Sequence, residues 1–181
     1  MNVLVTGGSR GIGAAAVRQF AREGWKTAFG YRSSREAALA LARETGALPL
    51  QGDVSRPEEA RSLVAQAEEA LGSLDALVCS AGIALPIQLL TDTTDEQWRQ
   101  VMGTDLDGVF YTLRAAIPGM VRRRRGSIVT VSSIWGVSGA SCEVPYSAAK
   151  AGVIGLTRAL AQELGPSQVR VNCVAPGVID T

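Results

Sequence analysis

A tyrosine and a lysine spaced to share one face of a helix are the first residues in this 181-residue chain that could do chemistry. The stretch PYSAAKAG places Tyr146 four residues before Lys150, which is just over one helical turn. An ordinary tyrosine is almost fully protonated at pH 7, and a neighbouring ammonium group stabilises its phenolate form. The pair could therefore serve as a general acid, a task for which this chain has no histidine.

Ser133 is a third candidate for the same reaction, because it ends a β-branched segment thirteen residues before Tyr146. Its hydroxyl could hydrogen-bond a substrate oxygen and stabilise the charge of a developing alkoxide. Without histidine, a Ser-His-Asp triad and an imidazole-bound metal are both excluded. The three scattered cysteines contain no CxxC pair, so we expect them to be reduced packing residues and we expect no metal site.

The turn TGGSRGIG, Thr6–Gly13, follows an apolar segment and opens a helical pattern. Glycines let the backbone turn tightly and let a pyrophosphate approach the free N–H groups of a helix N-terminus. In this context the turn predicts a dinucleotide site. The predicted contacts are Gly7, Ser9, Arg10, Gly11, Ile12 and Gly13. The same letters fit the Gly-x-Ser-x-Gly elbow of a hydrolase, but Ser9 would have no histidine as its base.

The end of the second predicted strand indicates which dinucleotide is bound. NAD sites usually place an acidic residue there to hold the ribose 2′-hydroxyl. This chain instead has Tyr31, Arg32 and Ser33. Because Arg10 and Arg32 would attract a 2′-phosphate, we expect NADP(H) in preference to NAD.

Short apolar segments alternate with amphipathic ones along the whole chain. The predicted strands lie at Asn2–Thr6, Lys26–Tyr31, within 47–54, within 75–82, at Gly126–Ser133 and within 169–177. The predicted helices lie at 11–23, Arg35–Thr45, Pro57–Leu71, Asp95–Arg122 and Tyr146–Leu164. Alternation of this kind predicts an α/β fold, a Rossmann-type doubly wound parallel sheet in a single domain over residues 1–181. Many of the candidate residues follow strands, so they should gather at the carboxyl edge of the sheet: Gly7–Gly13, Tyr31, Asp53, Ser80–Gly82, Ser133 and Pro176–Gly177.

The bulk composition excludes several other classes of protein. Apolar residues make up 46% of the chain and charged residues 19%, which is typical of a globular domain. A net charge of +1 gives no electrostatic reason to expect a nucleic-acid partner. No apolar segment approaches the ~20 residues of a membrane span, and the start MNVLVTGGSRG has no export signal. We therefore expect no membrane partner and a cytoplasmic location.

Taken together, these motifs resemble the short-chain dehydrogenase/reductase family, and within it the bacterial 3-oxoacyl-[acyl-carrier-protein] reductase group. The matching segments cover nearly the whole chain in the order of the family: TGGSRGIG, GDV, SAG, DLDGVF, IVTVSS, YSAAKAG, LAQELGPSQVRVNCVAPG and VIDT. The resemblance implies an NADPH-dependent reductase of a ketone, with a 3-oxoacyl thioester in fatty acid synthesis as the expected substrate.

The resemblance also assigns roles to residues. Tyr146 would be the proton donor, Lys150 would orient the nicotinamide ribose and tune the tyrosine, and Ser133 would position the carbonyl. The implied cofactor contacts are Asp53 and Val54 at the adenine, Ser80, Ala81 and Gly82 at the ribose, Tyr146 and Lys150, and Pro176, Gly177, Val178, Ile179 and Thr181 at the nicotinamide end.

The chain departs from the family pattern at two positions. The usual Asn-Asn-Ala-Gly is Cys79-Ser80-Ala81-Gly82 here. A helix asparagine, whose backbone carbonyl holds a relay water for the lysine, is matched by Asp105. The carbonyl survives that exchange, and the added carboxylate could alter the titration of the lysine, so Asp105 stays among the catalytic candidates.

Family members continue for several dozen residues past VIDT, so we expect this chain to lack the C-terminal lid helices and last strand. A cofactor-binding but catalytically silent association module is therefore an alternative, as is a reductase of sugar or steroid-like ketones. Arg122–Arg125 is expected to be a solvated helix end, with docking of an acidic acyl-carrier protein as a second interpretation. The family commonly forms tetramers, and we expect a homo-oligomer, a dimer or a tetramer.

Overall fold

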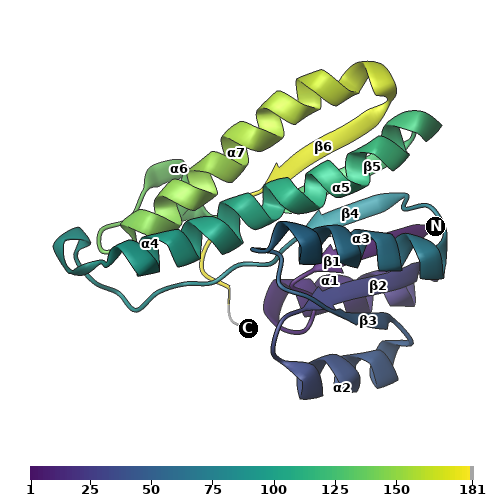
Figure 1. Ribbon diagram of the computed structural model, residues 1–181, viewed down its shortest axis with the longest axis horizontal. Coiled ribbons are helices and arrows are strands. Elements are labelled where there is room, and N and C mark those ends of the chain that lie inside the picture. The colour runs from purple at the N-terminus through teal and green to yellow at the C-terminus, as the bar shows by residue number, and fades with distance from the viewer. Residues whose placement is uncertain (180–181) are drawn as a thin grey trace.

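Six parallel strands form one sheet in the computed structural model, which describes residues 1–179 (Figure 1). The strands are β1 (Asn2–Thr6), β2 (Lys26–Tyr31), β3 (Leu48–Gln51), β4 (Ala76–Cys79), β5 (Gly126–Val131) and β6 (Val169–Val174). Their order across the sheet is β3-β2-β1-β4-β5-β6. The chain therefore winds outward from β1 in one direction and then from β4 in the other, which confirms the doubly wound fold predicted from the sequence.

Helices connect the strands. They are α1 (Gly11–Arg22), α2 (Arg35–Thr45), α3 (Pro57–Leu71), α4 (Asp95–Met102), α5 (Gly108–Arg123), α6 (Ile134–Ser138) and α7 (Val144–Leu164). Short 3-10 turns occupy Leu90–Asp92 and Gly165–Ser167. The single long helix expected over Asp95–Arg122 is instead two α-helices joined by a π-helical segment, Gly103–Asp107.

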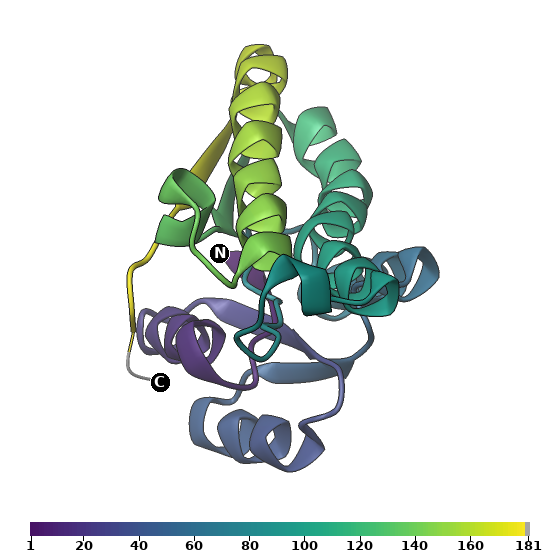
Figure 2. The same cartoon turned by 90° about the vertical axis from the view of Figure 1, so that its left-hand side faces the viewer.

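The helices cover the sheet as two layers, each with its own apolar core (Figure 2). On one face, α3, α5 and α7 pack through buried residues such as Leu63, Leu113 and Val153. On the other face, α1 and α2 pack through Val17 and Leu41. Because the sheet is covered on both faces, it is a rigid support for the loops at its edge.

Local sequence signals explain where several helices begin and end. Gly46 adopts a left-handed conformation, φ 71°, and closes α2, whereas Pro57 occupies the first turn of α3. Thr94 begins α4 with a capping box, in which its side chain accepts from the Gln97 N–H and the Gln97 side chain accepts from the Thr94 N–H.

The strand register brings the ends of the strands level with one another. Thr6 at the end of β1 pairs with Cys79 at the end of β4, and Val131 at the end of β5 pairs with Val174 at the end of β6. The loops that follow these strands consequently leave the sheet side by side. This edge holds the candidate residues.

Candidate active site

A cavity of about 530 Å³ lies at the carboxyl edge of the sheet, walled by the loops that follow all six strands. This volume is in the range of small-molecule sites. The predicted site residues in its wall are Gly7, Ser9, Arg10, Gly11, Ile12, Gly13, Tyr31, Arg32, Ser33, Asp53, Val54, Ser80, Ala81, Gly82, Asp105, Ser133, Tyr146, Lys150, Pro176, Gly177 and Ile179. The fold thus brings together residues from the whole length of the chain.

Two of the predicted contacts are not in that wall. Val178 is 94% exposed to solvent and points out of the cavity that its neighbours Gly177 and Ile179 line. Thr181 lies outside the described residues. Both positions follow β6, where the sequence carries no spacing signal that distinguishes an inward side chain from an outward one.

The glycine turn is shaped for close approach by a ligand. Gly7 and Gly11 have φ angles of 66° and 55°, which side-chain-bearing residues rarely adopt. A Cβ on Gly7 would lie 2.6 Å from the Ala81 Cα, and one on Gly13 would collide with the Gly7 carbonyl oxygen. Arg10 precedes α1 without making a side-chain cap, so the first N–H groups of this helix face the cavity unblocked. An open helix N-terminus behind a glycine cradle fits the pyrophosphate of a dinucleotide.

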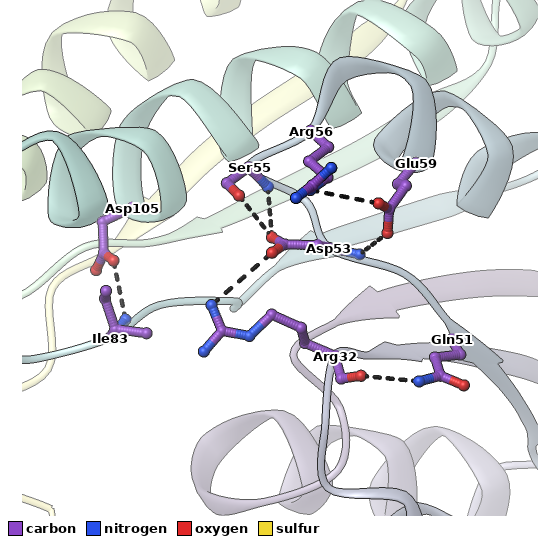
Figure 3. Close-up of polar contacts among 8 residues, drawn as sticks. All are labelled: Arg32, Gln51, Asp53, Ser55, Arg56, Glu59, Ile83 and Asp105. Atoms are coloured by element: carbon purple, nitrogen blue, oxygen red, sulfur yellow. Dashed lines mark hydrogen bonds and ion pairs between the residues drawn. The ribbon is translucent and has the colours of Figure 1, made fainter.

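The other end of the cavity carries Arg32 and Asp53 (Figure 3). Asp53 is held in place because its Oδ1 accepts from the N–H and hydroxyl of Ser55, at 2.9 and 2.7 Å. Arg32 Nη1 lies 3.9 Å from Asp53 Oδ2, a loose and half-exposed ion pair. The guanidinium can therefore turn toward another anion at little energetic cost.

Tyr146 and Lys150 lie on α7 as the four-residue spacing predicted, and both line the cavity. The Lys150 ammonium is 5.4 Å from the centre of the Tyr146 ring. The lysine is buried, only 4% exposed, and its Nζ donates to the Val131 carbonyl oxygen at 3.2 Å. The Lys150 ammonium is thus fixed beside the Tyr146 phenol at the carboxyl end of β5.

Ser133 caps α6, a short helix that the sequence pattern did not predict. Its Oγ accepts from the Trp135 N–H at 3.2 Å. Because that bond uses an oxygen lone pair, the hydroxyl hydrogen stays available to donate into the cavity. Ser133 is therefore oriented to bind an electronegative atom of a substrate.

Asp105 lies in the π-helical segment and is fully buried. Its Oδ1 accepts from the Ile83 N–H at 2.8 Å (Figure 3), and its Oδ2 lies 3.2 Å from the Lys150 Nζ. Burial raises the pKa of the Asp105 carboxyl, an effect that the Lys150 ammonium opposes. π-helical turns are frequent at functional sites, and here the widened turn places an acid beside Lys150.

Several residues that sequence reasoning missed support or line this site. The Ser132 hydroxyl donates to the Lys150 carbonyl oxygen at 2.8 Å and so ties α7 to the end of β5. Thr6 Oγ1 accepts from the Ala81 N–H at 3.4 Å and connects the loop after β4 to β1. Thr104 and Ile83 also line the cavity. Each of these contacts joins residues far apart in sequence, so no local spacing indicates them.

The three cysteines differ in how far they are buried, and Cys79 and Cys173 pack with the core. Cys79, at the end of β4, is buried, and burial raises the pKa of its thiol to about 12. Cys142 and Cys173 are half-buried, and all three are unpaired. Between residues 1 and 179, no group of three histidine, cysteine or acidic side chains could hold a metal ion. Over the same residues, no helix has both the length and the hydropathy needed to cross a bilayer.

Comparison with known proteins finds relatives that match nearly the whole chain. The family model for short chain dehydrogenases matches residues 1–181. A 3-oxoacyl-[acyl-carrier-protein] reductase, FabG, from Staphylococcus aureus is 40% identical, over 98% of this chain and 74% of the relative. An acetoacetyl-CoA reductase from Rhizobium meliloti is 44% identical, over 98% of this chain and 73% of its own length.

A solved structure agrees with the fold. The crystal structure of a candidate short-chain alcohol dehydrogenase from Sinorhizobium meliloti superposes with a TM-score of 0.92 at 37% identity, and covers 99% of this chain and 73% of that one. With the glycine turn, the Tyr146–Lys150 pair and the parallel sheet all in place, this chain belongs to the short-chain dehydrogenase/reductase family of oxidoreductases.

Proposed function

We propose that this chain is an NADPH-dependent reductase of a ketone, and that its substrate is a 3-oxoacyl thioester. The observation that carries the proposal is the placement of Tyr146 and Lys150, 5.4 Å from ring centre to Nζ, in the wall of the cavity that also contains the glycine turn. The substrate class is supported by two relatives, one of which is a 3-oxoacyl-[acyl-carrier-protein] reductase and the other an acetoacetyl-CoA reductase.

The residues of the chain divide the work between binding and proton transfer. Ser133 Oγ donates a hydrogen bond to the ketone oxygen and holds the carbonyl in the cavity. Tyr146 Oη then gives its proton to that oxygen as negative charge develops there. Lys150 Nζ stabilises the phenolate that remains, and its contact with the Val131 carbonyl oxygen keeps it in place.

The cavity fits a nicotinamide dinucleotide, which when bound supplies the hydride for this reaction. Gly7–Gly13 and the open N-terminus of α1 would hold its pyrophosphate. Asp53 and the loop after β4 would contact its adenosine end. Arg32, which directly follows the position where NAD sites usually have an acid, would bind a 2′-phosphate.

The test of the reaction is oxidation of NADPH in the presence of an acetoacetyl thioester, measured as the loss of NADPH absorbance. Tyr146→Phe removes only the hydroxyl and is expected to lower kcat by about 10²- to 10⁴-fold while leaving NADPH binding intact. Binding without consumption by the unaltered chain would instead support the silent association module. Turnover of sugar or steroid-like ketones in place of the thioester would overturn the substrate class alone.

The coenzyme preference has a separate test. Arg32→Ala is expected to raise the KM for NADPH by about 10- to 100-fold, because a hydrogen bond to a charged group contributes roughly 1.5–3 kcal/mol. The KM for NADH should change little, since that coenzyme has no 2′-phosphate. Equal losses with both coenzymes would show that Arg32 does not select between them.

A further inference from the structure

The buried acid beside Lys150 is held by three separate elements of the fold. Asp105 comes from the π-helical segment, its Oδ1 is fixed by the Ile83 N–H at 2.8 Å, and its Oδ2 is 3.2 Å from Nζ of Lys150 on α7. The two side chains are 0% and 5% exposed. Among the described residues, no group donates a well-aligned hydrogen bond to Oδ2, so its electrostatic partner is the ammonium.

Space for this contact exists because residue 82 has no side chain. A Cβ on Gly82 would lie 2.8 Å from Asp105 Oδ2 and 3.2 Å from Lys150 Nζ. The loop after β4 therefore packs directly over the ion pair and excludes water from one side of it. In such surroundings the interaction between opposite charges is much stronger than on an exposed surface.

We propose that the Asp105 carboxylate is a positioning residue, a buried counter-ion that fixes the Lys150 ammonium and offsets part of its positive charge at Tyr146. The ammonium is held from two sides, by Asp105 Oδ2 and by the Val131 carbonyl oxygen, each at 3.2 Å. The side-chain amine is thereby kept beside the Tyr146 ring, 5.4 Å from its centre.

Other charged groups near α7 do not compete for this role. The loop 80–83, α6 and β5 contain no ionisable side chain. On α4, Arg99 pairs with Asp95 and Glu96 at the surface, and on α5, Arg114 lies over the Phe110 ring. The remaining charged residues on the packed elements are Arg122, Arg123, Arg158, Glu163 and Arg170, together with Asp107 and Glu143 at segment ends. Asp105 is the acid for which a contact with Lys150 is present in the described residues.

The composition of the chain allows a direct measurement, because Lys26 and Lys150 are its two lysines. Lysine labelled with ¹³C at Cε gives one resonance from each, and exposed Lys26 serves as an internal reference. In Asp105→Asn at pH 7, the chemical shift of the Lys150 resonance should change, because the charge 3.2 Å from its ammonium nitrogen is lost. The Lys26 resonance should not move.

Asp107→Asn is the matched control, because it removes an exposed carboxylate from the same π-helical segment. It should leave the Lys150 resonance where it is in the unaltered chain. A Lys150 resonance that is unmoved in Asp105→Asn would overturn the proposal. The Asp105 carboxyl carbon is also titrated in the unaltered chain and in Lys150→Met, where loss of a true counter-ion must raise its midpoint, and an unmoved midpoint would overturn the proposal even if Asp105→Asn fails to fold.

The catalytic consequence rests on the proposed function and is measured separately. In Asp105→Asn, kcat for ketone reduction should fall while the KM for the ketone changes little, because the lysine beside Tyr146 is no longer fixed. A purely structural role would instead raise KM along with the loss of kcat, and would contradict the proposal. Because the Lys150 resonance and the Asp105 titration require no turnover, a chain that binds but does not reduce would still show both changes, so failure of the proposed function and failure of this inference are distinguishable.

Discussion

Gly82 shows how one missing side chain shapes the site. Gly82→Ala would bring a methyl group to 2.8 Å from Asp105 Oδ2 and 3.2 Å from Lys150 Nζ. We expect it to push the lysine from its place and to lower both ketone reduction and the free energy of unfolding, the latter by about 1–3 kcal/mol. Enzyme assay and urea denaturation measure the two effects.

Gly155→Ala is the control for that experiment. Gly155 lies within α7, is exposed, has an ordinary helical backbone, and a Cβ there would meet no atom within 4 Å. Alanine should therefore stabilise the helix by roughly 0.5–1 kcal/mol and leave activity unchanged. If both alanine variants lost stability equally, the close packing at Gly82 would not be the cause.

Local spacing predicted some of the site residues and could not predict others. Tyr146 and Lys150 could be predicted because they lie four residues apart on one helix, a spacing that places them on the same face. The contact of Lys150 with Asp105 joins two helical segments that are remote in sequence, and depends on the missing side chain at Gly82. A contact of that kind exists only once the chain has folded, so the sequence indicated Asp105 through resemblance alone.

At the scale of the element, the start of α4 has a clear local cause. Thr94 and Gln97 form a reciprocal capping box on the exposed surface. Thr94→Ala is expected to lower the free energy of unfolding by about 1 kcal/mol, because the Gln97 N–H loses its acceptor. Thermal unfolding checks this, and Thr94→Ser, which keeps the oxygen, should restore most of the stability. A loss of equal size in the serine variant would mean that the methyl group, not the cap, matters.

The elements themselves were predictable where their signals are local. Lys26–Tyr31, Arg35–Thr45 and Pro57–Leu71 begin and end where the apolar pattern, glycine and proline predict. Two of the elements that were not predicted were missed for different reasons. Ile134–Ser138 is too short to show a period, and the π-helical segment Gly103–Asp107 sits between two helices whose apolar faces read as one continuous pattern.

At the scale of the whole molecule, the buried ion pair costs free energy that the fold must supply. Replacing such a pair with well-packed hydrophobic side chains of similar volume is often neutral or stabilising by about 1–4 kcal/mol. The double variant Asp105→Leu with Lys150→Met should therefore unfold at the same or a higher urea concentration than the unaltered chain, while ketone reduction is lost. Lys150→Met alone should be clearly less stable, since it leaves Asp105 buried without its partner. A double variant less stable than both singles would show that the pair is there for folding.

The widened turn at Gly103–Asp107 also means that the fold and the site should respond differently to the deletion of one residue. A π-helical turn holds one residue more than an α-helical turn, so deleting a residue there would let the chain close as one regular helix with α4 and α5 still facing the same neighbours. The same deletion inside α3 would rotate everything beyond it by about 100° and expose its apolar face. Asp105 therefore lies in the stretch of these joined helices where deletion of one residue would preserve the fold but would remove the carboxylate from Lys150.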